Sequence, residues 1–397
     1  MPQTHLPPIL LLMITSAASP LAMNILVPSV AVIQGEFAVS YRTVQLTLTL
    51  YMFTLALGQF VYGPLSDALG RRQIMLWSIA IFTAGGMLGA VAPGLDVLIA
   101  SRVIQAAGGC GMIVLSRVIV VDVHSGDRAA SVLGFITMAW VLVPMFAPLL
   151  GGIVTDHFGW RPVCLLTGLL GLATFGMTWI YLTETLAAPR PFPGVVHLMT
   201  EIGGLSRNRA FASNTLHVAL ATLVFYAFIA GAPMIVSHIS DGGSTVYGTY
   251  FVLVSIGYSA GNFLTGGLVQ RFGAPALVTG GTLLSLAGCG IMVVLFRIGL
   301  VTPFSIFATM SVIAVGCGLS VPCGFSAAGG ARPDMTGTAL ALTGCIQMAV
   351  GAAGTVIVSS LQPLWPQAMA LTMTAGAAAA VFAGVAATRT RTRTRRG

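Results

Sequence analysis

Long apolar runs, separated by short polar segments, make up almost the whole chain. A run of about 20 apolar residues is long enough to cross a bilayer as an α-helix. Twelve such runs lie near residues 8–33, 43–66, 74–92, 96–121, 130–153, 161–183, 210–236, 246–269, 276–296, 300–326, 337–361 and 366–387. Several contain Gly and Pro, which membrane helices tolerate better than soluble helices do. The pattern predicts an all-α membrane protein with twelve transmembrane helices.

The first apolar run has features that argue against a cleaved signal peptide. No lysine or arginine precedes it, and Pro20 and Asn24 lie within it. A signal peptide carries a basic segment before its apolar core. We therefore expect this run to remain as the first transmembrane helix.

The longest interruption of the apolar pattern, residues 184–209, divides the twelve runs into two sets of six. It is rich in proline and arginine. We predict an N-terminal six-helix bundle at 1–183, a cytoplasmic linker at 184–209, a C-terminal six-helix bundle at 210–387 and a basic cytoplasmic tail at 388–397.

A short polar motif follows the second helix of each half. The sequence GPLSDALGRR at 63–72 recurs in weakened form as GGLVQRFGAP at 266–275. The matching pairs, each 203 residues apart, are Gly63 and Gly266, Leu65 and Leu268, and Gly70 and Gly273. This spacing indicates an internal duplication, which is common in transporter folds.

Composition and charge support a membrane location. The chain is 56% hydrophobic and only 7% charged, too little charge for a soluble domain of 397 residues. With a cytoplasmic N-terminus, the extracytoplasmic loops receive only Arg42, Arg161 and Arg297, and the other arginines outside the helices fall on the cytoplasmic side. This bias orients both termini to the cytoplasm of a bacterial inner (plasma) membrane. The net charge of +8 then indicates contact of the tail with anionic lipid, not with nucleic acid.

No motif indicates catalysis, a metal or a cofactor. The six cysteines lie in apolar runs without the spacing of a metal site or a disulfide framework. The chain contains no HExxH, and no pair of acids lies in the middle of a helix. We therefore expect neither an enzyme nor a bound cofactor.

The segment GPLSDALGRR concentrates three charges in a short cytoplasmic turn. Gly63 and Gly70 suit close backbone approach, and Arg71 and Arg72 hold the turn in the cytoplasm. Topology does not require Asp67. Its carboxylate either binds the positive N-terminal end of a neighbouring helix or caps its own turn.

This segment resembles the signature loop of the major facilitator superfamily. The stretch 45–76 is similar to drug–proton antiporters of the bicyclomycin and chloramphenicol/florfenicol resistance group. Further similar stretches are SRVIQAAGGCGM (101–112), PMFAPLLGG (144–152) and FGWRPV (158–163). The likeness is high over the N-terminal half and mostly architectural over the C-terminal half. It implies the major facilitator fold and multidrug efflux or antibiotic-resistance transport.

The resemblance also implies a cytoplasmic latch, formed by Gly63, Asp67, Gly70, Arg71 and Arg72, between the halves. In the family this latch engages helix eleven. The repeat copy has lost the acid, because Gln270 and Arg271 stand in that region. Only the first copy is therefore expected to latch.

Arg102 and Gln105 lie in helix four. A membrane arginine is costly unless it faces the bundle interior or water, or snorkels to the interface. The resemblance implies that Arg102, with Gln105, serves proton coupling or substrate binding. Arg117 lies near the cytoplasmic end of the same helix, where snorkelling or pairing with Asp122 accounts for it.

Helix five carries the motif Pro144, Pro148, Gly151 and Gly152. Proline bends a helix and paired glycines allow close packing. The resemblance implies that the motif helps to seal the site on one side. The family commonly has glycine where this chain has Ala147, and simple packing is the alternative role.

Asn24 in helix one stands where the family has an aspartate. An amide does not bind and release a proton near neutral pH. All ten acids fall at helix ends or in loops. His217, near Asn214 in helix seven, is the titratable group left within the membrane, and hydrogen bonding within the bundle is its alternative role.

These features predict a secondary transporter that works by alternating access as a monomer. It would export a small neutral or anionic organic molecule, because Arg102 lies within the membrane and the acids do not, with protons as the coupling ion. Since Asn24 replaces the expected acid, a proton-independent facilitator or importer of the same fold remains the second hypothesis.

Overall fold

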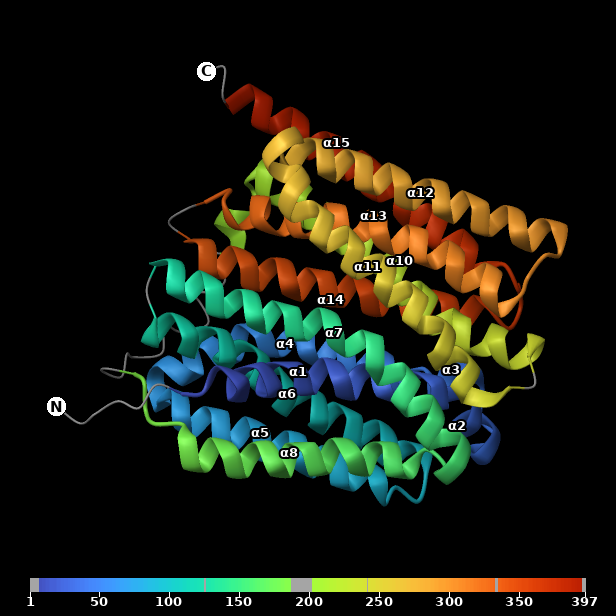
Figure 1. Ribbon diagram of the computed structural model, residues 1–397, viewed down its shortest axis with the longest axis horizontal. Coiled ribbons are helices and arrows are strands. Elements are labelled where there is room, and N and C mark those ends of the chain that lie inside the picture. The colour runs from blue at the N-terminus through green and yellow to red at the C-terminus, as the bar shows by residue number, and fades with distance from the viewer. Residues whose placement is uncertain (1–6, 125, 187–201, 241, 333–334, 395–397) are drawn as a thin grey trace. The chain divides into compact units, whose positions relative to one another are not determined.

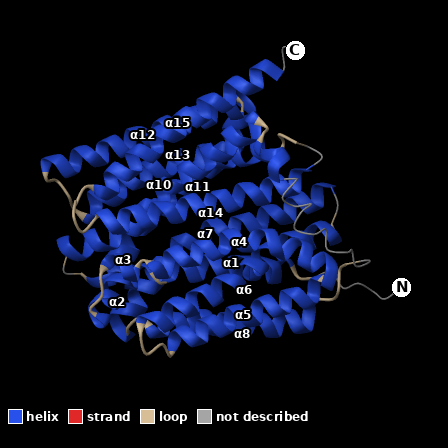
Figure 2. Ribbon diagram, turned by 180° about the vertical axis from the view of Figure 1, so that it is seen from behind, coloured by secondary structure: helices blue, strands red, loops and turns tan. Residues whose placement is uncertain are grey.

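The computed structural model describes residues 7–394 except 125, 187–201, 241 and 333–334 (Figure 1). Its regular elements are helices (Figure 2). The chain divides into two compact units, here called the first unit (residues 1–39 and 46–193) and the second unit (40–45 and 194–397). The predicted linker lies mostly outside the described residues.

The first unit contains α1 (Ile9–Ile25), the 3₁₀-helix η1 (Val27–Ser29), α2 (Val30–Phe37), α4 (Leu46–Leu69), α5 (Arg71–Ala90), α6 (Leu95–Val123), α7 (Gly126–Phe158) and α8 (Arg161–Tyr181). The second unit contains α3 (Tyr41–Val44), α10 (Arg209–Ile239), α11 (Gly243–Phe272), α12 (Ala274–Ile298), α13 (Pro303–Gly329), α14 (Thr336–Leu361) and α15 (Ala368–Thr394).

The predicted all-α membrane fold is confirmed. Within the described residues, eleven helical segments are long and apolar enough to cross a membrane. In addition, α7 runs for 33 residues, well beyond the roughly 20 that a crossing requires. These twelve long segments agree with the twelve apolar runs of the sequence.

The first span is not one continuous helix. After α1 ends at Ile25, the chain forms a 3₁₀ turn around Pro28 and then continues as α2. Proline has no N–H to donate within a helix, so the α-helical hydrogen-bond ladder is interrupted there. The Ser29 N–H instead donates to the Leu26 carbonyl at 3.0 Å. The break lies close to Asn24.

The duplicated motif has the same backbone geometry in both units. Gly70 and Gly273 each form a one-residue turn between two helices, with φ of +99° and +78°. Their N–H groups donate to the carbonyls of Ser66 and Val269, at 3.1 and 3.0 Å. Residues that carry a side chain rarely adopt such positive φ values, which explains why glycine stands at both positions.

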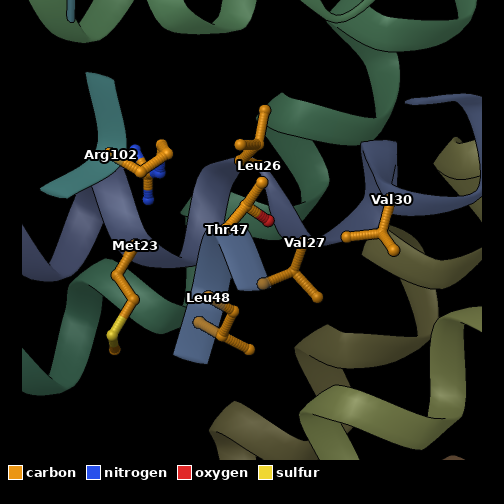
Figure 3. Close-up of a pocket in the computed structure, with 7 residues that line it drawn as sticks. All are labelled: Met23, Leu26, Val27, Val30, Thr47, Leu48 and Arg102. Carbon is orange, nitrogen blue, oxygen red and sulfur yellow. The ribbon is translucent and has the colours of Figure 1, made fainter. Parts of the chain in front are cut away.

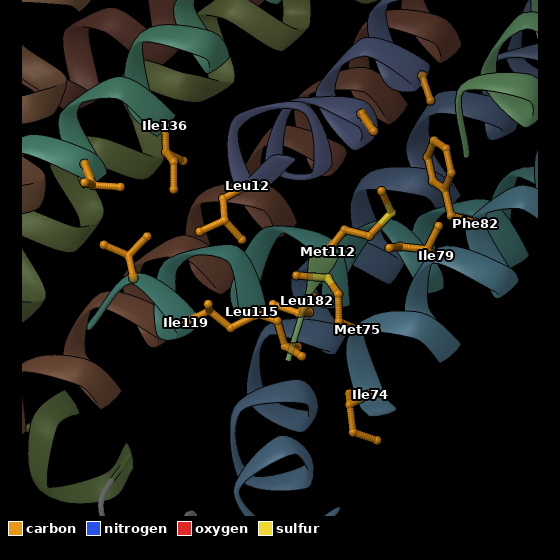
Figure 4. Packing of buried hydrophobic residues seen from close by; sticks show 14 residues of the cluster. Leu12, Ile74, Met75, Ile79, Phe82, Met112, Leu115, Ile119, Ile136 and Leu182 are labelled. Carbon is orange, nitrogen blue, oxygen red and sulfur yellow. The ribbon is translucent and has the colours of Figure 1, made fainter. Parts of the chain in front are cut away.

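The core of the first unit gathers on α6 (Figure 4). Met112, Leu115 and Ile119 of this helix pack with buried residues of α1, α5 and α7. Gly108 brings α5 very close, because a Cβ there would collide with the Ser78 carbonyl oxygen. A small residue on α6 thus allows α5 to pack closely against the helix that carries Arg102.

In the second unit, a proline lies inside α13. Pro322 supplies no N–H to the carbonyl of Gly318, one turn earlier. The Thr265 hydroxyl of α11 lies 3.0 Å from that carbonyl and 2.9 Å from the Gly261 carbonyl of its own helix. A side chain of the neighbouring helix therefore shares its one proton between the Gly318 carbonyl and its own backbone.

Candidate functional site

Arg102 lies inside the first unit, and its side chain does not extend to an interface. Its residue is 3% exposed. One terminal nitrogen donates to Gln105 Oε1, and the other donates to the Ala22 carbonyl of α1 at 2.9 Å. The guanidinium carbon lies 4.3 Å from the centre of the Tyr51 ring. These contacts favour the interior position over snorkelling.

Hydrogen bonds hold the groups that contact Arg102. Gln105 Nε2 donates to Thr167 Oγ1 of α8 at 2.9 Å, which aims the amide oxygen at the guanidinium. The Tyr51 hydroxyl of α4 lies 2.9 Å from Ser19 Oγ and 3.1 Å from the Ser19 carbonyl of α1. Sequence reasoning missed Tyr51, Ser19 and Thr167, and their only signal was a polar group within an apolar run.

A small pocket adjoins Arg102 (Figure 3). Its volume of about 10 Å³ corresponds to roughly one water molecule. Its polar lining residues are Arg102 and Thr47, and the rest of its lining is apolar, formed by Met23, Leu26, Val27, Val30 and Leu48. Among the described residues, the buried Arg102 Nε has no hydrogen-bond partner. One N–H of a residue that lines the pocket is therefore unused.

Asn24 is buried near this site. Its Nδ2 donates to the Pro20 carbonyl, one turn back in α1, at 2.8 Å. A carboxylate has no N–H and could not make this bond. Asn24 also lies two residues after Ala22, whose carbonyl accepts from Arg102. Asn24, where the family has an aspartate, therefore has its side chain hydrogen-bonded within α1, two residues from the contact of that helix with Arg102.

The expected latch residues form an ion-pair cluster at the end of α4. Asp67 lies in the last turns of α4, not in a loop, and binds Arg71 at 2.5 Å. Arg71 Nε also binds Asp122 of α6 at 2.9 Å, so Asp122 forms an ion pair with Arg71. The Asp67 side chain remains 37% exposed. Its engagement with α14, the eleventh span, stays a prediction.

Glu184 completes this cluster. Its carboxylate accepts from the N–H groups of Arg71 and Arg72, at 2.9 and 3.2 Å, and so caps the N-terminus of α5. The Arg72 guanidinium donates to the carbonyls of Leu182 and Trp179 at the end of α8, at 2.7 and 3.0 Å. Sequence analysis had placed Glu184 in the linker and missed this role.

The two glycines of the motif differ. A Cβ on Gly70 would lie 2.7 Å from the Glu184 carboxylate, so a side chain, not a second backbone, approaches Gly70 closely. A Cβ on Gly63 would meet no atom within 4 Å. The close approach expected at Gly63 is thus not seen among the described residues. Gly63 lies within α4, on a side of the helix that no described residue contacts closely.

The helix-five motif lies in α7, which packs on the first span. A Cβ on Gly151 would collide with the Ile25 carbonyl oxygen, where α1 ends. The hydroxyls of Ser29 and Thr155 are 2.6 Å apart in the next turn. Pro148 and Gly152 are buried, and Pro144 lies in α7 at a position whose side chain is not described. This geometry supports the packing role.

His217 is fully buried in the second unit. Its Nδ1 lies 3.1 Å from the Ala380 carbonyl of α15, and its Nε2 has no hydrogen-bond partner within the part of the chain that the structure describes. Gly324 and Gly384 make room for the ring, since a Cβ at either would come within about 3 Å of it. One ring nitrogen is thus hydrogen-bonded within the bundle, as the alternative role of His217 requires.

Comparison with known proteins agrees with this architecture. Residues 12–355 match the sequence profile described as Major Facilitator Superfamily. A chloramphenicol resistance protein of Pseudomonas aeruginosa is 25% identical over 350 residues, covering 87% of this chain and 83% of the relative. A bicyclomycin resistance protein homolog of Haemophilus influenzae is 25% identical over 358 residues, 89% of each chain.

A solved structure gives the fold independently. The crystal structure of a D-xylose–proton symporter superposes with a TM-score of 0.76 at 14% identity, covering 95% of each chain. The resemblance read from the sequence motifs is thereby confirmed. Because the family profile matches most of the chain, this protein is an integral membrane transporter that belongs to the Major Facilitator Superfamily.

Proposed function

We propose that this transporter exports small neutral or anionic organic molecules across a bacterial inner membrane by proton antiport. The observation that carries the proposal is Arg102. It is buried, forms no ion pair among the described residues, and has an unused Nε–H beside a pocket. Substrates rich in hydrogen-bond acceptors would use that donor, and a lipophilic cation would meet an uncompensated like charge.

The names of two relatives suggest the chemical class. They refer to resistance to chloramphenicol and bicyclomycin. We therefore propose phenicol-like or dipeptide-like antibiotics, or small siderophores, as substrates. The pocket is too small for a whole drug, so it would hold one acceptor group, with the rest of the molecule lying elsewhere.

Proton coupling is tested with everted membrane vesicles that carry the protein. Antiport predicts that radiolabelled chloramphenicol accumulates when the vesicle interior is acidified and that nigericin, which dissipates the pH gradient, abolishes the accumulation. Equilibration of the label that nigericin does not change would instead identify a proton-independent facilitator. This second candidate function is considered because Asn24, an amide, cannot carry the coupling proton.

The substitution Asn24→Asp tests whether the family's carrier position remains in register. The new carboxylate would stand on α1 two residues after Ala22, whose carbonyl accepts from Arg102, and a carboxylate can bind and release a proton. We expect transport to become more strongly dependent on the pH gradient. The measurement is the uptake rate over a series of imposed gradients, with Asn214→Asp in α10 as control. Unchanged dependence would place coupling elsewhere.

Tyr51 is expected to position Arg102. A cation–π contact with the face of an aromatic ring stabilises a desolvated guanidinium by up to about 2 kcal/mol, which corresponds to roughly 30-fold in an equilibrium constant. Tyr51→Phe keeps the ring and should retain most transport, whereas Tyr51→Leu should raise the apparent KM several-fold. Equal KM values for the two variants would show that the ring contact has no part in transport.

A further inference from the structure

A second, larger cavity lies on the first unit, apart from the Arg102 pocket. It is a groove of about 460 Å³ between α4 and α5, with Ala107 of α6 among its lining residues. This volume is within the range of ligand-binding cavities, about 300–1,000 Å³. Along α4 the groove runs from Thr54 to Leu65, a rise of about 16 Å. The groove therefore extends along about three turns of α4.

Glycines on the facing helices create the groove. Gly58 of α4 packs against Cys110 of α6, since a Cβ there would lie 2.8 Å from the sulfur. Gly108 of α6 packs in the same way against Ser78 and Phe82 of α5. In both ribbon views α6 lies between α4 and α5 (Figures 1 and 2). Both α4 and α5 pack closely on α6, and a furrow therefore remains between α4 and α5.

The walls of the groove are apolar and exposed. Leu57, Val61 and Trp77 are more than half exposed, and all three belong to membrane-spanning helices. The lining carries no charged residue. The hydroxyls of Thr54 and Ser78 donate to carbonyls of their own helices, at 2.8 and 2.7 Å. A third polar group of the lining, the Tyr62 hydroxyl, interacts with the Ser78 side chain, so it also has a partner within the protein.

We propose that this groove binds an acyl chain of a membrane phospholipid. At membrane depth, the medium beside an exposed apolar furrow is hydrocarbon, and an empty furrow forfeits dispersion contacts along its walls. A lipid tail is as apolar as leucine, so shape and close packing drive its binding. Its length along α4 and its volume of about 460 Å³ accommodate a single extended chain. The site is independent of the proposed export function.

Two tryptophans provide a matched test. Trp77 lines the groove and is 61% exposed, whereas Trp179 of α8 is outside the groove and 59% exposed. The full-length protein is reconstituted in phosphatidylcholine brominated on its acyl chains, which quenches nearby tryptophans, and is then transferred to maltoside micelles. The contribution of each tryptophan is obtained by comparison with Trp77→Phe and Trp179→Phe.

A bound chain predicts that most of the quenching of Trp77 survives the transfer and that almost none of the quenching of Trp179 does. Ala107→Leu fills the floor and Val61→Phe fills a wall, so both should abolish the retention. Gly176→Leu, which adds a side chain to α8 where no atom lies within 4 Å, is the matched control and should leave it unchanged. Equal recovery of the two tryptophans, or retention in both filled variants, would show ordinary surrounding lipid and overturn the proposal.

Discussion

Arg102→Ala is expected to abolish transport, and Arg102→Lys to retain part of it. Alanine removes the hydrogen bonds to Gln105 and the Ala22 carbonyl, the contact with the Tyr51 ring and the donor beside the pocket. Each charge-assisted hydrogen bond contributes about 1.5–3 kcal/mol. Lysine keeps the charge but lacks the planar fork of donors that binds two acceptors at once.

The measurement is the initial rate of chloramphenicol uptake into everted vesicles, normalised to the amount of folded protein. Arg297→Ala, at an exposed position in the last turn of α12, is the matched control and should transport normally. Normal transport by Arg102→Ala would show that the arginine only packs α6 against α1.

Asp67→Asn is expected to lower transport by about 5- to 150-fold, the range of a conformational coupling of roughly 1–3 kcal/mol. The protein should still fold, because Arg71 keeps its bonds to Asp122 and Ser66. What the variant loses is a partly exposed carboxylate, the group that the latch would present to the other half of the transporter.

Transport and folding are separated by measuring the uptake rate together with the thermal unfolding temperature in detergent. Asp96→Asn is the control, because Asp96 lies in the first turn of α6, at the opposite end of that helix from Asp122. A well-folded Asp67→Asn protein that transports at the normal rate would contradict the latch.

The helices and the repeat followed from local sequence properties. The length of an apolar run determines whether it can cross a bilayer, so the spans were predictable. A glycine at Gly70 and again at Gly273 reflects the positive φ of a one-residue turn, which is also local. These features need no knowledge of distant partners.

The partners of the charged groups could not be predicted, because they come from distant parts of the chain. Glu184 caps α5 from 113 residues away, and the Ala22 carbonyl that binds Arg102 is 80 residues away. A backbone carbonyl carries no sequence signal at all. The interruption at Pro28 had a local cause, but the apolar pattern continues across it and suggested one helix.

The central claim, that Arg102 selects neutral or anionic substrates, is tested most directly by comparing two substrates in one vesicle preparation. Initial uptake of neutral chloramphenicol and of the cationic dye ethidium is measured with wild-type protein and with Arg102→Ala. The account predicts chloramphenicol uptake by the wild type, its loss in Arg102→Ala, and no ethidium uptake by either. Efficient ethidium uptake that persists in Arg102→Ala would contradict it.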